Sequence, residues 1–369
     1  MEEPRLLVDG AEAFPEIIRR IRASERSVYV NMFIWRDDAI GGALARELLR
    51  SAERGVRVGI VKDRYGALCE YAEEGQRSFF HPNLCPAERV SIWTLELLYG
   101  SDLLFRERTG QENALCRALR AHPNVTVSAD KFRRDHSKFW VFDDEILILG
   151  GVNVEDKENG ADRAGRRYRD YMVELRGADA VRRFWERREA AGPDADDLFA
   201  FNRKEPRRCF ELKNRYLRLI GGAEHELTIL MAYFAPDREI TDAIRRAAAR
   251  GAAVRLVMPA RANFTDAGNK RVLRSLLGCP GVALHLTDRM LHAKLLMSER
   301  EITIGSCNIS KKAFRQLDEL NVFLPNDDGT FARAVRASVE ETVALSHPVT
   351  DASALRYSRA VAALESLLM

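Results

Sequence analysis

Two clusters of side chains in this 369-residue chain share the same residue types and nearly the same spacing. Each has a His, a Lys two positions later and an Asn further on: His136, Lys138 and Asn153 in the first, and His292, Lys294 and Asn308 in the second. The Asn follows its Lys by 15 residues in the first cluster and by 14 in the second. This repetition indicates one active site assembled from two related halves.

The chemistry that these residue types favour is phosphodiester transfer. A neutral His can attack phosphorus to give a phosphohistidine, while a protonated His donates to the departing oxygen. The two Lys and the two Asn are expected to stabilise the non-bridging oxygens, most strongly in the transition state. Such a reaction needs neither a metal ion nor a cofactor, and we predict none.

Acidic residues near each cluster fall into two groups. Each His needs an acidic partner to fix its tautomer. Asp170 follows the first His by 34 residues and Glu319 follows the second by 27, and the spacing leaves open which carboxylate serves which His. Asp143 and Glu299 both lie five residues after the Lys. We interpret these two as structural acids of a turn rather than as catalysts.

The segments around the clusters also repeat. In each half an apolar strand leads through Asp38 or Asp237 into an amphipathic helix that ends at Arg-Gly, where the Gly suits a left-handed C-terminal cap. A strand, a helix, a short strand and the strand that carries the His and the Lys follow. The order β-α-β-α-β-β, found twice, predicts an α/β fold of two pseudo-two-fold-related repeats, each a mixed sheet flanked by helices, sharing one active site. We place the halves at residues 1–195 and 205–369.

One segment, at about residues 67–108, is present in the first half only. It contains Phe79 and Phe80 and a strongly apolar stretch around Ile92–Phe105. Two interpretations are open: a helical excursion packed on the core, or a lid or membrane-contacting element over the active site.

Composition limits the cellular setting. With 58 Lys+Arg against 55 Asp+Glu the net charge is only +3, which is not typical of a dedicated nucleic-acid binder. The six Cys show no C-x-x-C pair and no metal-ligand spacing, which favours free thiols in a reducing compartment. No apolar run approaches the ~20 residues that span a bilayer. We expect a cytoplasmic protein that is peripherally associated with the cytoplasmic membrane.

The paired clusters resemble the phospholipase D superfamily, whose signature is H-x-K-x4-D followed by G-[GS]-x-N, normally in two copies. The first copy, HSKFWVFD and GGVN, fits without a gap. The second, HAKLLMSE and GSCN, has Glu299 in place of the Asp and a turn shorter by one residue. We favour His136 as the nucleophile because its motif is the unaltered one. Within the superfamily the pattern is similar to bacterial cardiolipin synthases that lack transmembrane helices, with Asp38, Asp63 and the Tyr168–Tyr171 run as further support.

This resemblance implies a phosphatidyltransferase that works through a phosphatidyl-histidine. Its partners would be a phospholipid substrate such as phosphatidylglycerol and a peripheral membrane surface. A phospholipase D hydrolase, and a phosphodiesterase or nuclease, are the alternative enzymes, although the near-neutral charge makes nucleic acid a disfavoured partner. A non-enzymatic binding module would be expected to have lost a His or a Lys, and all four are present. The sequence does not define an oligomeric state.

Overall fold

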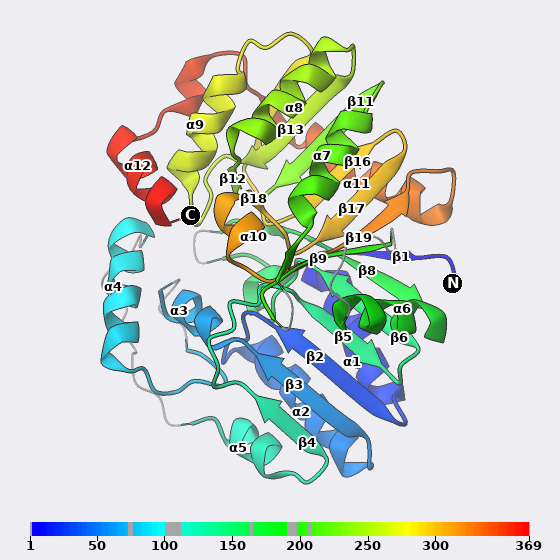
Figure 1. Ribbon diagram of the computed structural model, residues 1–369. Helices are drawn as coiled ribbons and strands as arrows, with labels where there is room; N and C mark the ends of the chain where they lie inside the picture. Colours follow the sequence, from blue (N-terminus) through cyan, green and yellow to red (C-terminus); the bar gives the residue numbers. More distant parts are fainter. Residues whose placement is uncertain are drawn as a thin grey trace.

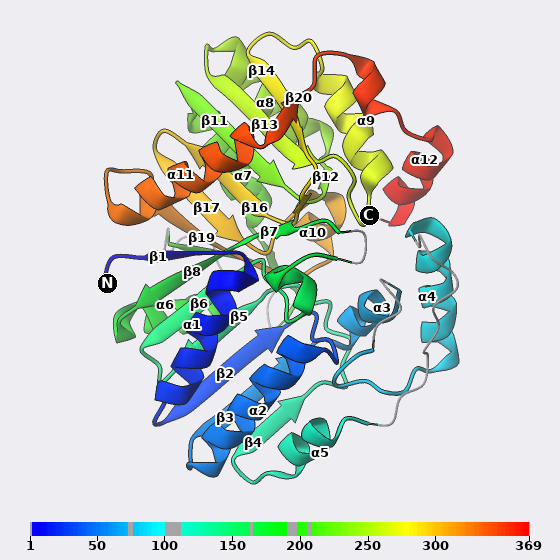
Figure 2. The same cartoon turned by 180° about the vertical axis from the view of Figure 1, so that it is seen from behind.

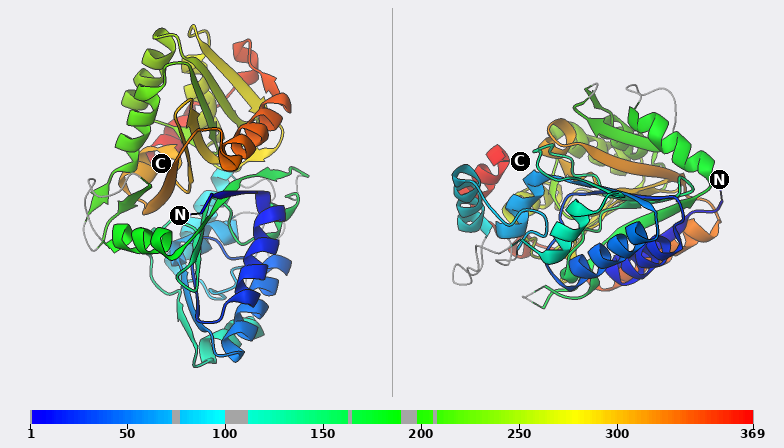
Figure 3. Two further views of the ribbon diagram at one scale, coloured as in Figure 1. Left: turned by 90° about the vertical axis from the view of Figure 1, so that its right-hand side faces the viewer. Right: turned by 90° about the horizontal axis from the view of Figure 1, so that it is seen from below.

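The computed structural model describes residues 2–72, 77–99, 112–162, 165–189, 198–205 and 208–368. Two α/β halves, each built on a large sheet, stack one above the other (Figures 1 and 3). The first sheet has the order β1-β8-β6-β5-β2-β3-β4 and the second β10-β9-β19-β17-β16-β11-β13-β14-β20. Two small sheets pair β12 with β18 and β15 with β7.

The strands of the first half are β1 (Arg5–Val8), β2 (Ser27–Met32), β3 (Arg57–Lys62), β4 (Val125–Ser128), β5 (Phe139–Phe142), β6 (Ile146–Gly150), β7 (Tyr168–Arg169) and β8 (Tyr171–Arg176). Those of the second half are β9 (Phe199–Arg203), β10 (Cys209–Phe210), β11 (Glu226–Met231), β12 (Phe234–Ala235), β13 (Ala253–Pro259), β14 (Val282–Thr287), β15 (Met290–Leu291), β16 (Lys294–Ser298), β17 (Glu301–Gly305), β18 (Ile309–Ser310), β19 (Glu319–Pro325) and β20 (Ser346–Pro348).

The helices of the first half are α1 (Asp9–Ala23), α2 (Ala39–Glu53), α3 (Arg64–Ala72), α4 (Pro86–Tyr99), α5 (Ala114–Ala121), the 3-10 helix η1 (Asp156–Asn159) and α6 (Ala178–Glu189). Those of the second are α7 (Leu212–Gly222), α8 (Arg238–Ala249), α9 (Asp266–Leu276), α10 (Lys311–Arg315), α11 (Thr330–Ala344), the 3-10 helix η2 (Ala352–Leu355) and α12 (Arg359–Leu368). In the described part of the chain, none of them combines the length and the apolar character that crossing a bilayer requires.

The two sheets repeat one topology. The order β8-β6-β5-β2-β3-β4 in the first matches β19-β17-β16-β11-β13-β14 in the second. In both, the three strands at one end run parallel and the others pair antiparallel, so both sheets are mixed. The prediction of a duplicated α/β fold is therefore confirmed. Strand β9 belongs to the second sheet, while residues 196 and 197, between the two expected halves, lie outside the described residues.

Matching helix caps explain why the repeat folds alike. The Asp38 carboxylate accepts the Gly41 N–H at the start of α2, and that of Asp237 accepts the Ile240 N–H at the start of α8. Both helices end before a Gly with positive φ, +98° at Gly55 and +108° at Gly251. Left-handed backbone of this kind favours glycine, so each helix stops at an equivalent point and its chain turns into the next strand.

A shared core fixes the two halves against each other. One cluster of buried apolar side chains includes Phe139 and Val141 of β5, Leu295 of β16 and Val335 of α11, and so draws on both sheets. Helices α1 and α2 lie side by side over the first sheet, and α11 runs across the back of the second (Figure 2). The interface is therefore continuous core, which positions the facing strand ends precisely enough for a shared site.

The first-half insertion divides into two parts with different roles. Phe79 and Phe80 are buried in the core of the first half, where both rings pack on Trp35. Helices α3 and α4 pack on each other instead, with Leu68 and Ile92 in a small separate cluster. Residues 100–111, and the side chains of residues 97–99, lie outside the described part, so the predicted apolar stretch is seen only in its first residues. The part with Phe79 and Phe80 therefore belongs to the core of the first half, whereas α3 and α4 form a separate unit outside that core.

Candidate active site

The two motifs come together because each half adds its backbone to the other. Strand β15 runs parallel to β7, and the N–H of His292 donates to the carbonyl of Arg169 at 2.8 Å. At the other motif, the N–H of His136 donates to the carbonyl of Asp318, also at 2.8 Å. We expected each His to lie on its strand, and this was wrong. His136 precedes β5 and His292 precedes β16, because the chain there pairs with the opposite half instead of its own sheet.

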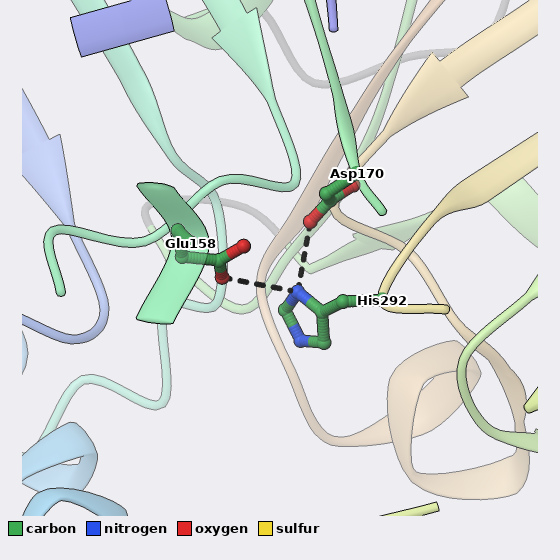
Figure 4. A group of neighbouring side chains, drawn as sticks. All are labelled: Glu158, Asp170 and His292. Atoms are coloured by element: carbon green, nitrogen blue, oxygen red, sulfur yellow. Dashed lines mark hydrogen bonds and ion pairs between the residues drawn. The ribbon is translucent and has the colours of Figure 1, made fainter. Parts of the chain in front are cut away.

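Each His is held by a carboxylate from the opposite half. His136 Nδ1 lies 3.1 Å from both carboxylate oxygens of Glu319. His292 Nδ1 lies 2.8 Å from Asp170 Oδ2, as Figure 4 shows. The sequence left this pairing open, and the structure shows it to be crossed. With Nδ1 engaged, Nε2 is the ring nitrogen left for chemistry in both rings.

A third carboxylate, which the sequence analysis missed, also reaches His292. Glu158 Oε1 lies 3.4 Å from His292 Nδ1, the same ring nitrogen that Asp170 contacts (Figure 4). Glu158 is on η1, five residues after Asn153, and its Oε2 is buried without a hydrogen-bond partner. Comparison of the repeats could not reveal it, because the equivalent position in the second half is Ala313.

The two motif lysines are almost completely buried beside the rings. Lys138 Nζ donates to the carbonyl of His136 at 2.6 Å, and Lys294 Nζ donates to that of His292. Lys294 Nζ also lies 3.9 Å from Asp170 Oδ2. Each lysine therefore folds back on its own motif, close to the site that the paired rings define.

The rings face an open cavity that residues of both halves line. His136, His292, Asn153 and Asn308 all line it. The side-chain oxygen of each Asn is buried without a hydrogen-bond partner. Since unpaired buried amide oxygens are rare in folded proteins, these side chains are arranged to engage something that enters the cavity.

The electrostatics of the cluster favour an incoming anion. Burial, followed by repulsion from Lys138 and Lys294, holds the pKa values of both His well below the usual range. Burial and Lys294 also lower the pKa of Lys138 to about 7. Four groups that can carry positive charge thus suppress one another's protonation, and a phosphate placed among them would relieve this repulsion.

The buried acids show the opposite shifts. Burial raises the pKa of Glu319 to about 8 and that of Asp170 to about 6, although Lys138 and Lys294 both oppose the change. Burial and the neighbouring Asp170 raise the pKa of Glu158 well above its ordinary value. Proton sharing inside this cluster is therefore energetically accessible near neutral pH.

One group of side chains has the spacing of a metal site. Ligand atoms of Glu158, Asp170 and His292 all lie within 4.8 Å of one another. However, His292 Nδ1 is already paired with Asp170, and the ammonium of Lys294 is close to the same carboxylate. A cation would have to displace these contacts, so the donor set suits a proton better than a metal ion.

Asp143 and Glu299 lie away from the cavity, in the turns that follow β5 and β16. The Asp143 carboxylate accepts the backbone N–H groups of Glu25, Arg26 and Ser27. That of Glu299 accepts those of Glu224 and Glu226. Both acids thus fasten the segment that enters the central strand of their sheet, β2 or β11. These contacts agree with the interpretation as turn acids.

The duplicated fold and the paired H-x-K and G-x-N motifs around one cavity define a phospholipase D-like protein. The family described as "Cardiolipin synthase, PLD-like domain" matches residues 17–189 and 216–342, and the chain belongs to it. This confirms the resemblance drawn from the motifs, and with it the enzyme class, a cardiolipin synthase-like member of the phospholipase D superfamily.

Individual relatives agree with this placement. Cardiolipin synthase B of Salmonella typhi is 27% identical over 360 residues, which cover 91% of this chain and 79% of that protein. Cardiolipin synthase B of Escherichia coli K12 is 26% identical, covering 92% and 80%. Among solved structures, phosphatidylserine synthase of Haemophilus influenzae superposes with a TM-score of 0.68 at 14% identity, covering 98% of this chain and 92% of that one. At this identity the likeness concerns the fold alone.

Proposed function

We propose that the protein transfers a phosphatidyl group from one phospholipid to the hydroxyl of another, such as phosphatidylglycerol, through a phosphatidyl-histidine. The observation that carries the proposal is the crossed pairing of each motif His with a carboxylate of the opposite half, at one cavity. Two rings fixed in this way leave two Nε2 atoms for the two tasks of the reaction, attack on phosphorus and proton transfer. Each half contributes one of the two rings, so neither half alone could perform both tasks.

We assign the attack to His136 and the proton transfer to His292. In the first step Nε2 of His136 bonds to phosphorus while the bond to the leaving alkoxide breaks, and His292 gives that alkoxide a proton. In the second step His292 takes the proton of the acceptor hydroxyl, whose oxygen bonds to phosphorus as His136 departs. Asp170 and Glu158 both lie within 3.4 Å of Nδ1 of the ring that must carry positive charge, which supports this division of roles.

The remaining motif residues would act on the phosphate itself. Asn153 and Asn308 line the cavity from opposite halves, and Lys138 and Lys294 are buried beside the two His, each bonded to the carbonyl of its own motif His. As charge develops on the non-bridging oxygens, these donors are already in place and need little reorganisation. The lowered pKa of Lys138 indicates that its positive charge is costly until an anion is bound.

An apolar wall beside the rings supports a lipid substrate. Leu68, Cys69 and Leu95, all from the first-half insertion, line the same cavity as the two His. Outside the cavity, three large apolar side chains are exposed: Val90 (63%) and Trp93 (54%) of α4, and Phe132 (51%). Exposed large apolar groups beside a lipid cavity are suited to the interfacial region of a bilayer, so we propose peripheral membrane association through α4.

The test is a product assay with vesicles of labelled phosphatidylglycerol, in the presence of a chelator. We expect cardiolipin and free glycerol, with no requirement for a divalent metal. Phosphatidic acid as the sole product would instead indicate a hydrolase, which uses the same residues with water as the acceptor. Dependence on added metal would contradict the mechanism, and cleavage of a nucleic-acid diester alone would contradict the substrate class.

A second assay asks whether α3 and α4 serve the lipid. Deleting residues 67–108 would remove Phe79 and Phe80 from the core, so substitutions are the better probe. Leu68→Gln together with Leu95→Gln should lower turnover of phosphatidylglycerol more than that of a small soluble diester. Equal losses on both substrates would mark the two leucines as structural.

A further inference from the structure

Two lysines at equivalent positions of the repeat have different electrostatic surroundings. Lys157 lies four residues after Asn153 and Lys312 four residues after Asn308, and both line the active-site cavity. Lys157 is buried, with its Nζ 3.4 Å from a carboxylate oxygen of Glu155. On the Lys157 side, therefore, an acid within the same segment balances the lysine charge.

The second half has lost those acids. Ser310 takes the place of Glu155, and Ala313 takes the place of Glu158. Lys312 is partly exposed, and no described carboxylate lies within ion-pair distance of it. Within the described residues, the positive charge that Lys312 brings to the cavity wall is therefore not paired with a carboxylate.

A second cation reinforces this charge from the other half. Lys312 Nζ lies 5.5 Å from the centre of the Tyr65 ring, and Arg134 Cζ lies 5.9 Å from the same centre. Tyr65 lines the cavity, and the carbonyl of Arg134 accepts the N–H of Asp318 at 2.9 Å, which fixes that segment beside the site. Among the described residues Arg134 has no ion-pair partner. Both cations lie near one aromatic ring, and neither forms an ion pair with a carboxylate in the described part of the chain.

We propose that Lys312 and Arg134 form a subsite for the phosphodiester of an anionic phospholipid acceptor. The central His and Lys cluster holds the phosphate under attack, so the acceptor's own phosphate needs a separate place. Lys312, which lines the cavity, and Arg134, whose guanidinium lies near the same Tyr65 ring, provide it: Lys as a compact charge and Arg as a planar donor. This inference rests on the proposed phosphatidyl transfer and adds to it a basis for acceptor choice.

The test is a competition between two acceptors in the same neutral-detergent micelles. Labelled phosphatidylglycerol is the donor and also the anionic acceptor, and 1-monooleoylglycerol, which has free hydroxyls and no phosphate, is the neutral one. The measured quantity is the ratio of cardiolipin to phosphatidyl-monooleoylglycerol. Because both products draw on the same donor and the same phosphohistidine, changes in donor binding, folding or bulk micelle binding cancel in this ratio.

We expect Lys312→Gln to lower the ratio about tenfold, the size of one lost charge-assisted hydrogen bond, and Arg134→Gln to lower it less. Lys312→Arg, which keeps the charge, should stay near the wild-type ratio. Lys311→Gln, which removes an exposed charge from the same helix, should do so as well. An unchanged ratio in the Lys312→Gln and Arg134→Gln variants would overturn the subsite while leaving the transferase function in place. Phosphatidic acid as the only wild-type product would overturn both.

Discussion

The two His of the site sit in unequal surroundings although their motifs match. His136 faces one carboxylate, Glu319, which is itself braced by the Ser306 hydroxyl at 2.5 Å. His292 faces two, Asp170 and Glu158. The acid beside His136 is therefore held by a neutral hydroxyl, whereas two acids meet at Nδ1 of His292.

The glycine motif reflects the same difference. At the second position of G-[GS]-x-N the first half has Gly151, against which the Asp170 carboxylate packs so closely that a Cβ there would lie 2.3 Å from Oδ1. The second half has Ser306, whose side chain bonds to Glu319 instead. Duplication thus preserved the groups that face the phosphate and changed the groups that control protons. This is the pattern expected where two equivalent rings have taken different tasks.

The largest predicted effect separates these two tasks directly. His136→Ala and His292→Ala should each lower turnover of phosphatidylglycerol by at least about 10³-fold, since each removes one half of the mechanism. A diester with a p-nitrophenyl leaving group needs no acid to depart. With this substrate His292→Ala should still release one equivalent of nitrophenol and accumulate a phosphohistidine, whereas His136→Ala should release none.

His347→Ala is the matched control, because His347 is exposed on β20 and remote in sequence from both motifs. It should retain wild-type rates on both substrates. A nitrophenol burst in His136→Ala but not in His292→Ala would reverse the assignment of roles. An active single variant on the lipid would contradict the shared site itself.

A smaller effect should come from Glu158, which distinguishes the two sides most clearly. Where it is ionised, the Glu158 carboxylate favours the protonated form of His292, so Glu158→Gln should lower the pKa of that ring. Transfer that needs His292 as the acid is lost as pH rises through this pKa. The falling limb of the lipid rate profile should therefore move to lower pH in the variant.

The p-nitrophenyl diester again supplies the control. Since its departure needs no acid, Glu158→Gln should leave its pH profile in place. If Glu158 only supports the local fold, both substrates should lose rate equally and neither limb should move. That result would mean that Glu158 supports the packing around His292 and does not control its protonation.

Much of this architecture could be predicted from the sequence because its motifs occur there in two copies. The spacing of His, Lys and Asn, the helix caps at Asp38 and Asp237, and the turn acids all recur at equivalent positions. Each of these features depends on residues close together in the chain, so the sequence pattern indicates it. The duplicated α/β fold followed from these observations.

Features without a repeat counterpart, and those that depend on contacts between the halves, could not be predicted. The position equivalent to Glu158 in the other copy is Ala313, so a comparison of the two copies does not reveal this acid. The crossed His–carboxylate pairs join residues 183 and 122 positions apart, and such contacts are fixed by packing rather than by spacing. Phe79 and Phe80 appeared to belong to one insertion, yet they complete the first-half core, since burial depends on the surrounding helices and strands.

The smallest predicted effects test the most symmetric pair, the turn acids. Asp143 accepts three backbone N–H groups and Glu299 accepts two, so Asp143→Ala should lower the free energy of unfolding by about 2 kcal/mol and Glu299→Ala by about 1 kcal/mol. Burial acts to raise the pKa of Glu299, but these amide contacts outweigh it and hold the pKa below its ordinary value. Its contribution is accordingly complete above about pH 4.5 and is lost as pH falls through the lowered pKa.

Thermal or denaturant unfolding, followed alongside kcat, measures both halves of this prediction. Glu145→Ala is the matched control for Asp143, since Glu145 lies in the same hairpin and has an exposed pairing with Arg26 at 3.2 Å, which should contribute little. Stability should fall in the two turn variants while kcat stays close to wild type. A collapse of kcat at unchanged stability would instead give these acids a direct part in the chemistry, and the division between groups that fasten the strands and groups that act on phosphate would have to be redrawn.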